Sequence, residues 1–152
     1  MKTPKNKKIV VAVLVALLAT LYGGYFLVKR YEENKEYKEF VKYMEEYKND
    51  TYGGKTPEET LQLFINALKA GDTDLAAKYF VFGKREKMKN DLKIGKERGN
   101  LEKFLEYLNN PKKGKEVYEG AYIITFYKDK KVLMRIDLFF NKQAKIWKIE
   151  SL

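Results

Sequence analysis

Few polar side chains in this chain could do chemistry, because the sequence contains neither histidine nor cysteine. That composition excludes disulfides, thiol nucleophiles, imidazole acid–base catalysis and the usual zinc sites. Tyrosine hydroxyls and carboxylates remain, and near the predicted sheet the candidates are Tyr79, Tyr122 and Asp137. Asp137 follows Arg135 by two residues on one predicted strand, which is typical of a solvated or interfacial ion pair. No two of these residues form an acid–base pair, so the sequence favours binding over catalysis.

The elements that must position these residues begin with a long apolar stretch near the N-terminus. Residues 9–28 contain no charged side chain, whereas Lys7 and Lys8 precede them and Lys29 and Arg30 follow them. A helix of that length covers roughly 30 Å, the thickness of the hydrocarbon core of a bilayer. Three aromatic residues stand where a membrane–water boundary is expected: Tyr22, Tyr25 and Phe26. The stretch therefore predicts a transmembrane helix, because the alternative, a buried core helix, would need a larger domain around it.

The end of this stretch favours a permanent signal-anchor over a cleaved signal peptide. Leu21 and Tyr22 are bulky where a signal peptidase prefers small residues, although Gly23 and Gly24 leave cleavage open. The tail of residues 1–8 carries four lysines and no acid, which favours keeping it in the cytoplasm. Long C-terminal domains are translocated largely regardless of their charge. We therefore expect a single-pass protein of the cell membrane, with the N-terminus inside and the domain outside.

The net charge of +10 limits the partners. Residues 1–28 hold four lysines and no acid, which leaves 27 basic and 21 acidic residues beyond Val28. The lipid bilayer is one expected partner, through the apolar stretch. The moderately basic domain also suits a position near anionic lipid or an anionic wall polymer. Basic and acidic residues are interleaved throughout, which argues against nucleic acid as a partner. No cofactor is expected.

Residues 29–55 are predicted to form a helical stalk and a linker between the anchor and the domain. Apolar residues recur three and four apart and form one stripe on a charged helix: Tyr37, Phe40, Val41, Met44 and Tyr47. The stripe fits either a helix packed on its own domain or a short two-heptad zipper. Asparagine, aspartate and paired glycines in residues 49–55 then break the helix, so a domain of residues 56–152 is expected to follow.

The domain is predicted to begin with two helices. Thr56 can cap the first helix, Pro57 suits its first position, and Glu59 completes a capping box. Gly71 ends this helix, and Asp72 can cap a short second one. Two further helices are expected in the highly charged segment that follows: residues 85–94 and 101–108.

After Pro111 the pattern changes from helical to extended. Three segments rich in β-branched and aromatic residues predict an antiparallel meander: residues 117–127, 131–141 and 145–150. One face of the middle strand is apolar and must meet the helices: Val132, Met134, Ile136, Leu138 and Phe140. The other face carries the candidate interface: Leu133, Arg135, Asp137 and Phe139. The alternative is that the helices of residues 83–115 fold over that second face. The predicted fold class is α+β, with helices on one side of an antiparallel sheet.

The segment TPEETLQLFINALKAGDTDLAAKYF resembles the opening of small bacterial extracytoplasmic domains in the nuclear transport factor 2-like superfamily. The closing residues 144–152 are similar to the last strand of that family, in which the tryptophan, here Trp147, is buried. The resemblance implies a curved, cone-like sheet. Some members are isomerases, dehydratases or cyclases whose cavity holds polar groups, which implies a candidate cavity at Tyr79 and Tyr122.

The function expected from these features is binding at the cell envelope. Members of the superfamily recur in bitopic scaffold proteins of secretion machines and beside wall-enzyme domains. That resemblance implies a membrane-tethered, non-catalytic domain that binds a protein partner or a second copy of itself, or else lipid or a wall polymer. The alternative is a small-molecule-binding or isomerase- or dehydratase-like protein that uses the cavity, which Asp137 cannot enter from the face away from the helices. A third possibility is a pilot or stress-related envelope protein without a defined ligand.

Overall fold

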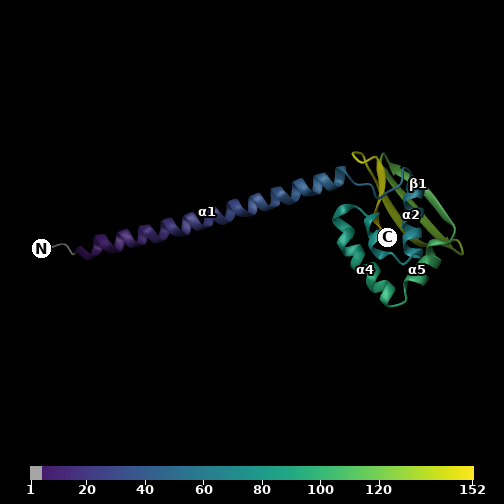
Figure 1. Ribbon diagram of the computed structural model, residues 1–152, viewed down its shortest axis with the longest axis horizontal. Coiled ribbons are helices and arrows are strands. Elements are labelled where there is room, and N and C mark those ends of the chain that lie inside the picture. Colours follow the sequence, from purple (N-terminus) through teal and green to yellow (C-terminus); the bar gives the residue numbers. More distant parts are fainter. Residues whose placement is uncertain (1–4) are drawn as a thin grey trace. The chain divides into compact units, whose positions relative to one another are not determined.

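The computed structural model describes residues 5–152 and divides the chain into two units, one ending at Tyr43 and one running from Met44 to Leu152. The part of the predicted basic tail that precedes Lys5, including Lys2, lies outside the described residues. Figure 1 shows the order of the elements along the chain.

The first unit is helical throughout its described part. Helix α1 (Lys5–Lys48) runs without interruption for 44 residues, which confirms a helix over residues 9–28 and shows that it continues to Lys48. The helix from Ile9 is long and apolar enough to cross a membrane, judged by length and composition. Its apolar side chains are exposed over residues 9–28, and Leu21, for example, is 69% exposed. Exposed apolar surface of this extent is unfavourable in water and favourable in lipid.

The second unit begins with the last turn of α1 and a loop that leads into helix α2 (Pro57–Lys69). The predicted cap is confirmed, because Thr56 Oγ1 accepts the N–H of Glu59 at 3.1 Å. Glu59 reaches back to the N–H of Lys55 at 2.7 Å, one residue before the position a capping box would predict. Gly71 adopts a φ of +68° after α2, as a helix C-terminus commonly requires.

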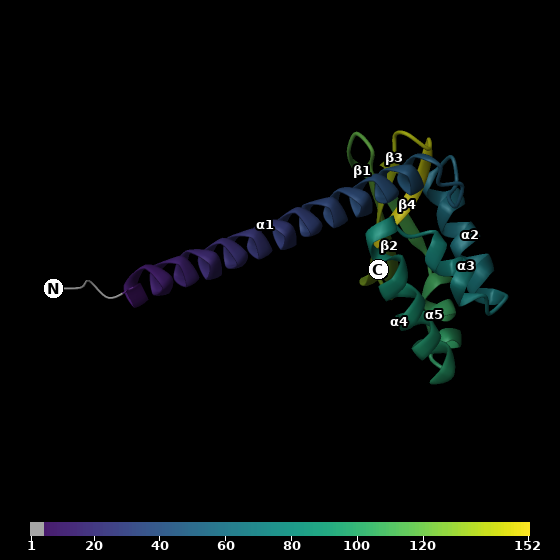
Figure 2. The same cartoon turned by 60° about the vertical axis from the view of Figure 1, so that its left-hand side comes forward.

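Three further helices complete a helical layer on one side of the sheet. Helix α3 (Thr73–Lys78) is capped by Asp72 as predicted, and it ends before Tyr79. After a short 3-10 turn, η1 (Phe82–Lys84), helix α4 (Arg85–Glu97) packs on α3, while helix α5 (Leu101–Leu108) packs on α2. Figure 2 shows these helices gathered beside one another. The two helices of the charged segment, α4 and α5, therefore extend the helical layer by packing on α3 and α2.

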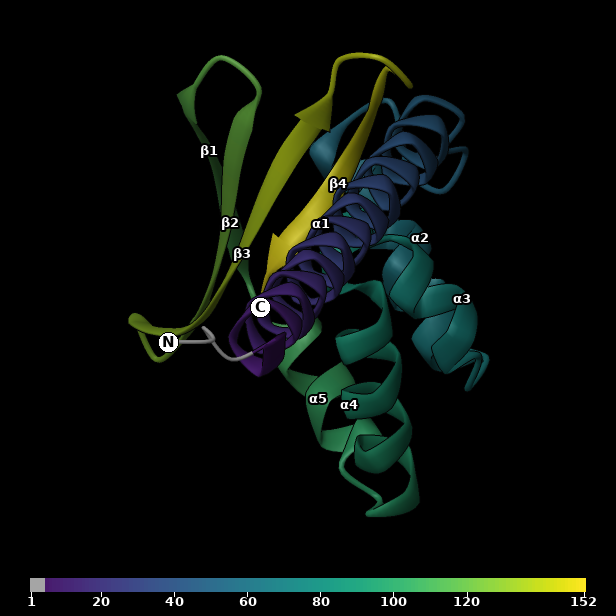
Figure 3. The same ribbon diagram turned by 90° about the vertical axis from the view of Figure 1, so that its left-hand side faces the viewer.

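The sheet has four antiparallel strands, not the three predicted. In the order β1 (Lys112–Tyr118), β2 (Ala121–Lys128), β3 (Lys131–Asn141) and β4 (Ile146–Ser151), each strand pairs with the next (Figure 3). The prediction of one strand over residues 117–127 is wrong. The chain reverses at Glu119 and Gly120, where Gly120 takes a φ of +81° that a tight hairpin turn needs. The α+β class with helices and an antiparallel sheet is confirmed.

The core lies between the helices and the inner face of the sheet. Phe64 of α2 is fully buried and meets the ring edges of Phe80 and Phe104, with centroid distances of 5.5 and 6.3 Å. The predicted inner face of β3 is confirmed at Ile136 and Leu138, which are 0% exposed.

Two residues predicted to face this core lie at its margin. Val132 is 65% exposed, because a bulge at Leu133 shifts the pairing so that Val132 meets Tyr127 while Met134 meets Phe126. Trp147 is only half-buried. Its ring packs against the ring of Phe140, with a distance of 5.5 Å between the two ring centroids.

Candidate functional site

The structure brings the predicted ion pair together on the outer face of β3. Arg135 Nη2 donates to Asp137 Oδ2 at 3.2 Å, and Ser151 Oγ donates to the same oxygen at 2.8 Å. Asp137 Oδ1 lies 3.0 Å from Arg135 Nε but accepts no hydrogen bond from the described residues. The Arg135 side chain is 59% exposed, and exposed ion pairs contribute little to stability. The ion pair of Arg135 and Asp137 therefore mainly fixes the positions of these two charged side chains on this face.

Apolar side chains surround that pair. Phe139 is 36% exposed, and its ring lies 6.2 Å from the ring of Tyr118, which the β1–β2 hairpin brings over the sheet. Val117 and Tyr118 are 50% and 60% exposed. Together they line a shallow hollow of about 160 Å³ with Arg135 and Asp137. Leu133 is half-buried on the same strand and does not line this hollow.

The sequence did not identify Val117 and Tyr118 as part of this surface. The prediction of one strand over residues 117–127 has no turn after Tyr118. The turn at residues 119 and 120 is what brings Tyr118 beside Phe139. We call the surface formed by Val117, Tyr118, Arg135, Asp137 and Phe139 the outer face.

The two tyrosines of the predicted cavity have different surroundings. Tyr79 is 7% exposed, and burial raises the pKa of its hydroxyl, with Tyr52 and Asp72 acting in the same direction. A hydrogen bond with Glu58 raises the pKa of Tyr122, and burial adds to this shift. Both hydroxyls therefore stay protonated near neutral pH and do not act as bases there.

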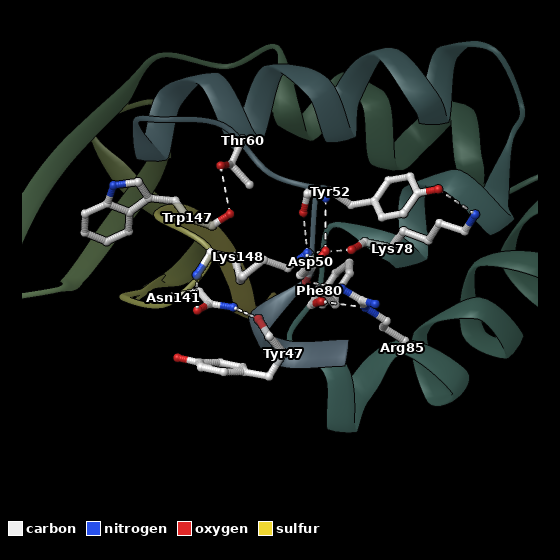
Figure 4. Close-up of polar contacts among 11 residues, drawn as sticks. Tyr47, Asp50, Tyr52, Thr60, Lys78, Phe80, Arg85, Asn141, Trp147 and Lys148 are labelled. Atoms are coloured by element: carbon white, nitrogen blue, oxygen red, sulfur yellow. Dashed lines mark hydrogen bonds and ion pairs between the residues drawn. The ribbon is translucent and has the colours of Figure 1, made fainter. Parts of the chain in front are cut away.

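A buried charged cluster that the sequence did not predict lies elsewhere in the same unit. We call Asp50, Arg85 and Lys148 the Asp50 cluster (Figure 4). The side chains of Asp50 and Lys148 are 4% and 2% exposed, and that of Arg85 is 18% exposed. Lys148 Nζ lies 3.0 Å from Asp50 Oδ2, and Arg85 Nη2 pairs with the same oxygen.

Each member of the Asp50 cluster is fixed by its own element. Asp50 follows α1 directly, and its Oδ1 accepts the N–H of Tyr52 at 3.0 Å, which shapes the loop. Arg85 begins α4 and donates through Nε to the carbonyl of Phe80 at 3.1 Å. Lys148 belongs to β4 and donates to the carbonyls of Lys78, at 2.6 Å, and Tyr52. The cluster thus ties the loop after α1 to both the sheet and the helical layer.

The cluster contains two cations and one carboxylate, so it carries a net positive charge in a buried place. Burial lowers the pKa of Lys148 to about 8, Asp50 opposes this shift, and Arg85 adds to it. A lysine with such a pKa can be a nucleophile in an open site. Here the amino group is enclosed by three acceptors, so its arrangement suits a structural role.

Neither site provides a metal centre of the usual kind. Within residues 5–152, no three carboxylates are grouped so that they could hold a metal ion. Comparison of the chain with protein-family models, with curated proteins and with solved structures found no match.

Proposed function

We propose that this chain is a single-pass membrane protein that presents a small, non-catalytic binding domain outside the cell membrane. The domain docks a protein partner on the outer face. One observation carries the proposal: large apolar side chains around a single ion pair stay uncovered on that face, while α4 and α5 pack on α2 and α3.

The composition of the outer face fits an interface better than a solvated surface. Protein interfaces combine an apolar, aromatic centre with a polar rim, and arginine and tyrosine are enriched in them. Tyr118 and Phe139 supply the aromatic centre, and the pair of Arg135 and Asp137 supplies fixed charge beside it.

The membrane part of the proposal is supported by α1. Its apolar side chains are exposed over the whole of residues 9–28. The lysine-rich N-terminal tail supports a cytoplasmic N-terminus, and the resemblance to the nuclear transport factor 2-like superfamily supports a cone-like domain at a bacterial cell envelope.

Charges placed within α1 are expected to abolish membrane anchoring. Leu14→Arg with Leu18→Arg puts two guanidinium groups at the middle of the span, at a cost of about 2.5–3.5 kcal/mol each on insertion scales. The wild-type chain should stay in the membrane pellet after alkaline carbonate extraction, and the variant should move to the soluble fraction. Leu14→Ala with Leu18→Ala is the matched control and should stay in the pellet. Release of the wild-type chain by carbonate contradicts the anchor.

Orientation is tested on the same protein. Protease added to intact cells should digest residues 44–152 of the wild-type chain and leave residues 9–28 protected. Digestion only after the cells are opened contradicts an external domain.

The outer face is expected to touch a partner in cells. A photo-crosslinking amino acid at position 139 should give one discrete crosslinked species, whereas the same amino acid at Ile94 of α4, which is also exposed, should give none. Tyr118→Ser, which retains the crosslinker, should reduce the yield roughly tenfold, as expected for a loss of about 1.4 kcal/mol at an interface. Equal crosslinking from both positions, or none from position 139, contradicts the proposal.

A further inference from the structure

The two edges of the sheet differ in whether they are occupied. At the β4 edge, Trp147 N–H donates to the carbonyl of Gly54 at 2.9 Å, and Val81 N–H donates to that of Ile149 at 2.9 Å. At the other edge, β1 pairs only with β2 among the described strands, and all of its residues are exposed. The sheet therefore offers the backbone of β1 to another chain.

The register shows which groups of β1 are free. The carbonyl of Pro111 accepts the N–H of Tyr127 at 2.8 Å, so residues 111 and 127 form a hydrogen-bonded pair. Such pairs alternate along antiparallel strands, so the N–H and C=O groups of Lys112, Gly114 and Glu116 point away from β2. Three successive donor–acceptor sets at this spacing match those of an added strand.

Gly114, at the middle of this edge, has no side chain of its own and is exposed. A Cβ added at Gly114 would lie 2.2 Å from the hydroxyl oxygen of Tyr122, whose ring covers that position from the inner face. The glycine thus makes room for this ring, and its own backbone stays exposed at the centre of β1.

The charge of this edge indicates what would bind there. Three lysines and one acid stand on β1, and the nearby β2–β3 turn adds more lysines: Lys112, Lys113, Lys115, Lys128, Lys130 and Lys131, against Glu116 and Asp129. Antiparallel pairing with the β1 of a second copy about Gly114 would set Lys113 against Lys115 on both sides and Lys112 against Glu116, so repulsion offsets attraction and charge does not favour a second copy. An acidic strand would be attracted to the same groups.

We infer that the β1 edge accepts an extended, acidic segment of a partner protein as a fifth strand. Side chains of that segment opposite Lys113 and Lys115 lie on the same side of the sheet as Thr125 and Ile123, which is the side of the outer face. Strand addition is therefore continuous with docking there. The inference rests on the proposed function only in taking a protein as the partner.

The test uses the full chain in discs of phosphatidylcholine and a labelled peptide of alternating glutamate and valine, about ten residues long. The wild-type chain should bind this peptide, and amide exchange at Lys112, Gly114 and Glu116 should slow on binding. The same peptide with lysine in place of glutamate should not bind. Glu116→Pro, which removes one edge N–H at a position where an edge strand tolerates proline, should weaken binding at least about tenfold.

Matched variants separate strand addition from simple charge attraction. Glu116→Ala keeps the N–H and should bind at least as tightly as wild type. Lys113→Glu with Lys115→Glu leaves the backbone hydrogen bonds of β1 intact and should weaken peptide binding by roughly tenfold or more. This variant still tests the inference if the proline variant does not fold.

Equal binding by the Glu116→Pro and Glu116→Ala variants, or binding of both peptides alike, overturns the inference. So does the absence of peptide binding, because the lysines would then only block the edge. Phosphatidylglycerol vesicles that displace the peptide and bind both Glu116 variants equally would assign the basic groups to lipid instead. None of these results depends on crosslinking at position 139. Loss of that crosslink would therefore contradict docking on the outer face without bearing on strand addition at β1.

Discussion

Asp50→Ala is expected to lower the free energy of unfolding of residues 44–152 by roughly 3–5 kcal/mol, as removal of one partner of a buried ion pair does. The Asp50 carboxylate is the shared counter-ion of Arg85 and Lys148. Without it, two cations remain in a place where Lys148 is 2% exposed. Denaturant unfolding of the isolated unit, followed by circular dichroism, measures the change.

Two control variants show that charge causes this loss. Asp50→Asn keeps an oxygen for the N–H of Tyr52 but removes the charge, and it should cost nearly as much as Asp50→Ala. Lys148→Met leaves one cation with one carboxylate but also removes the donor to the carbonyls of Lys78 and Tyr52, so it should cost less than Asp50→Ala and still be measurable. Adding Lys148→Met to Asp50→Ala should recover part of the lost stability. A cost below about 1 kcal/mol for Asp50→Ala, typical of an exposed pair, contradicts the buried cluster.

The stability of the same unit is expected to rise as the pH increases from about 7 to about 9.5. The folded pKa of Lys148 is about 8 and its usual value is 10.5, so between these values the unfolded chain holds more protons. The stabilisation is complete above 10.5 and is lost as the pH falls through 8. Between pH 7 and 9.5 the free energy of unfolding should therefore rise by about 2 kcal/mol, because proton binding and folding are linked.

Lys148→Met is the control for the pH dependence, because it lacks the titrating group. Its free energy of unfolding should change by about 2 kcal/mol less over the window than that of the wild type. The window ends below 10 because the raised pKa values of Tyr79 and Tyr122 act in the opposite direction as tyrosines ionise in the unfolded chain. Parallel profiles for the two proteins contradict a lowered pKa at Lys148.

The parts of the fold that the sequence predicted correctly depend on local rules. The caps at Thr56 and Asp72 and the glycine at position 71 act within a few residues of themselves. The faces of β3 follow from alternation, which placed Arg135, Asp137 and Phe139 together.

The parts that were missed depend on tertiary contacts or on weak local signals. The polar start of β1 has no apolar alternation, because every residue of the strand is exposed. The members of the Asp50 cluster lie far apart in the sequence, and a lysine between Trp147 and Ile149 resembles an ordinary outward residue of a strand. Only the path of the loop after α1 brings Asp50 to it.

The closed β4 edge also limits the stoichiometry of anything built on this sheet. Because Gly54 and Val81 occupy that edge, a domain that gains a strand at β1 has no second edge to offer. Head-to-tail growth of sheets into fibres needs two open edges on every subunit. If β1 takes up a strand as inferred, this domain is monovalent in that sense, because its own sheet has no second open edge for another copy.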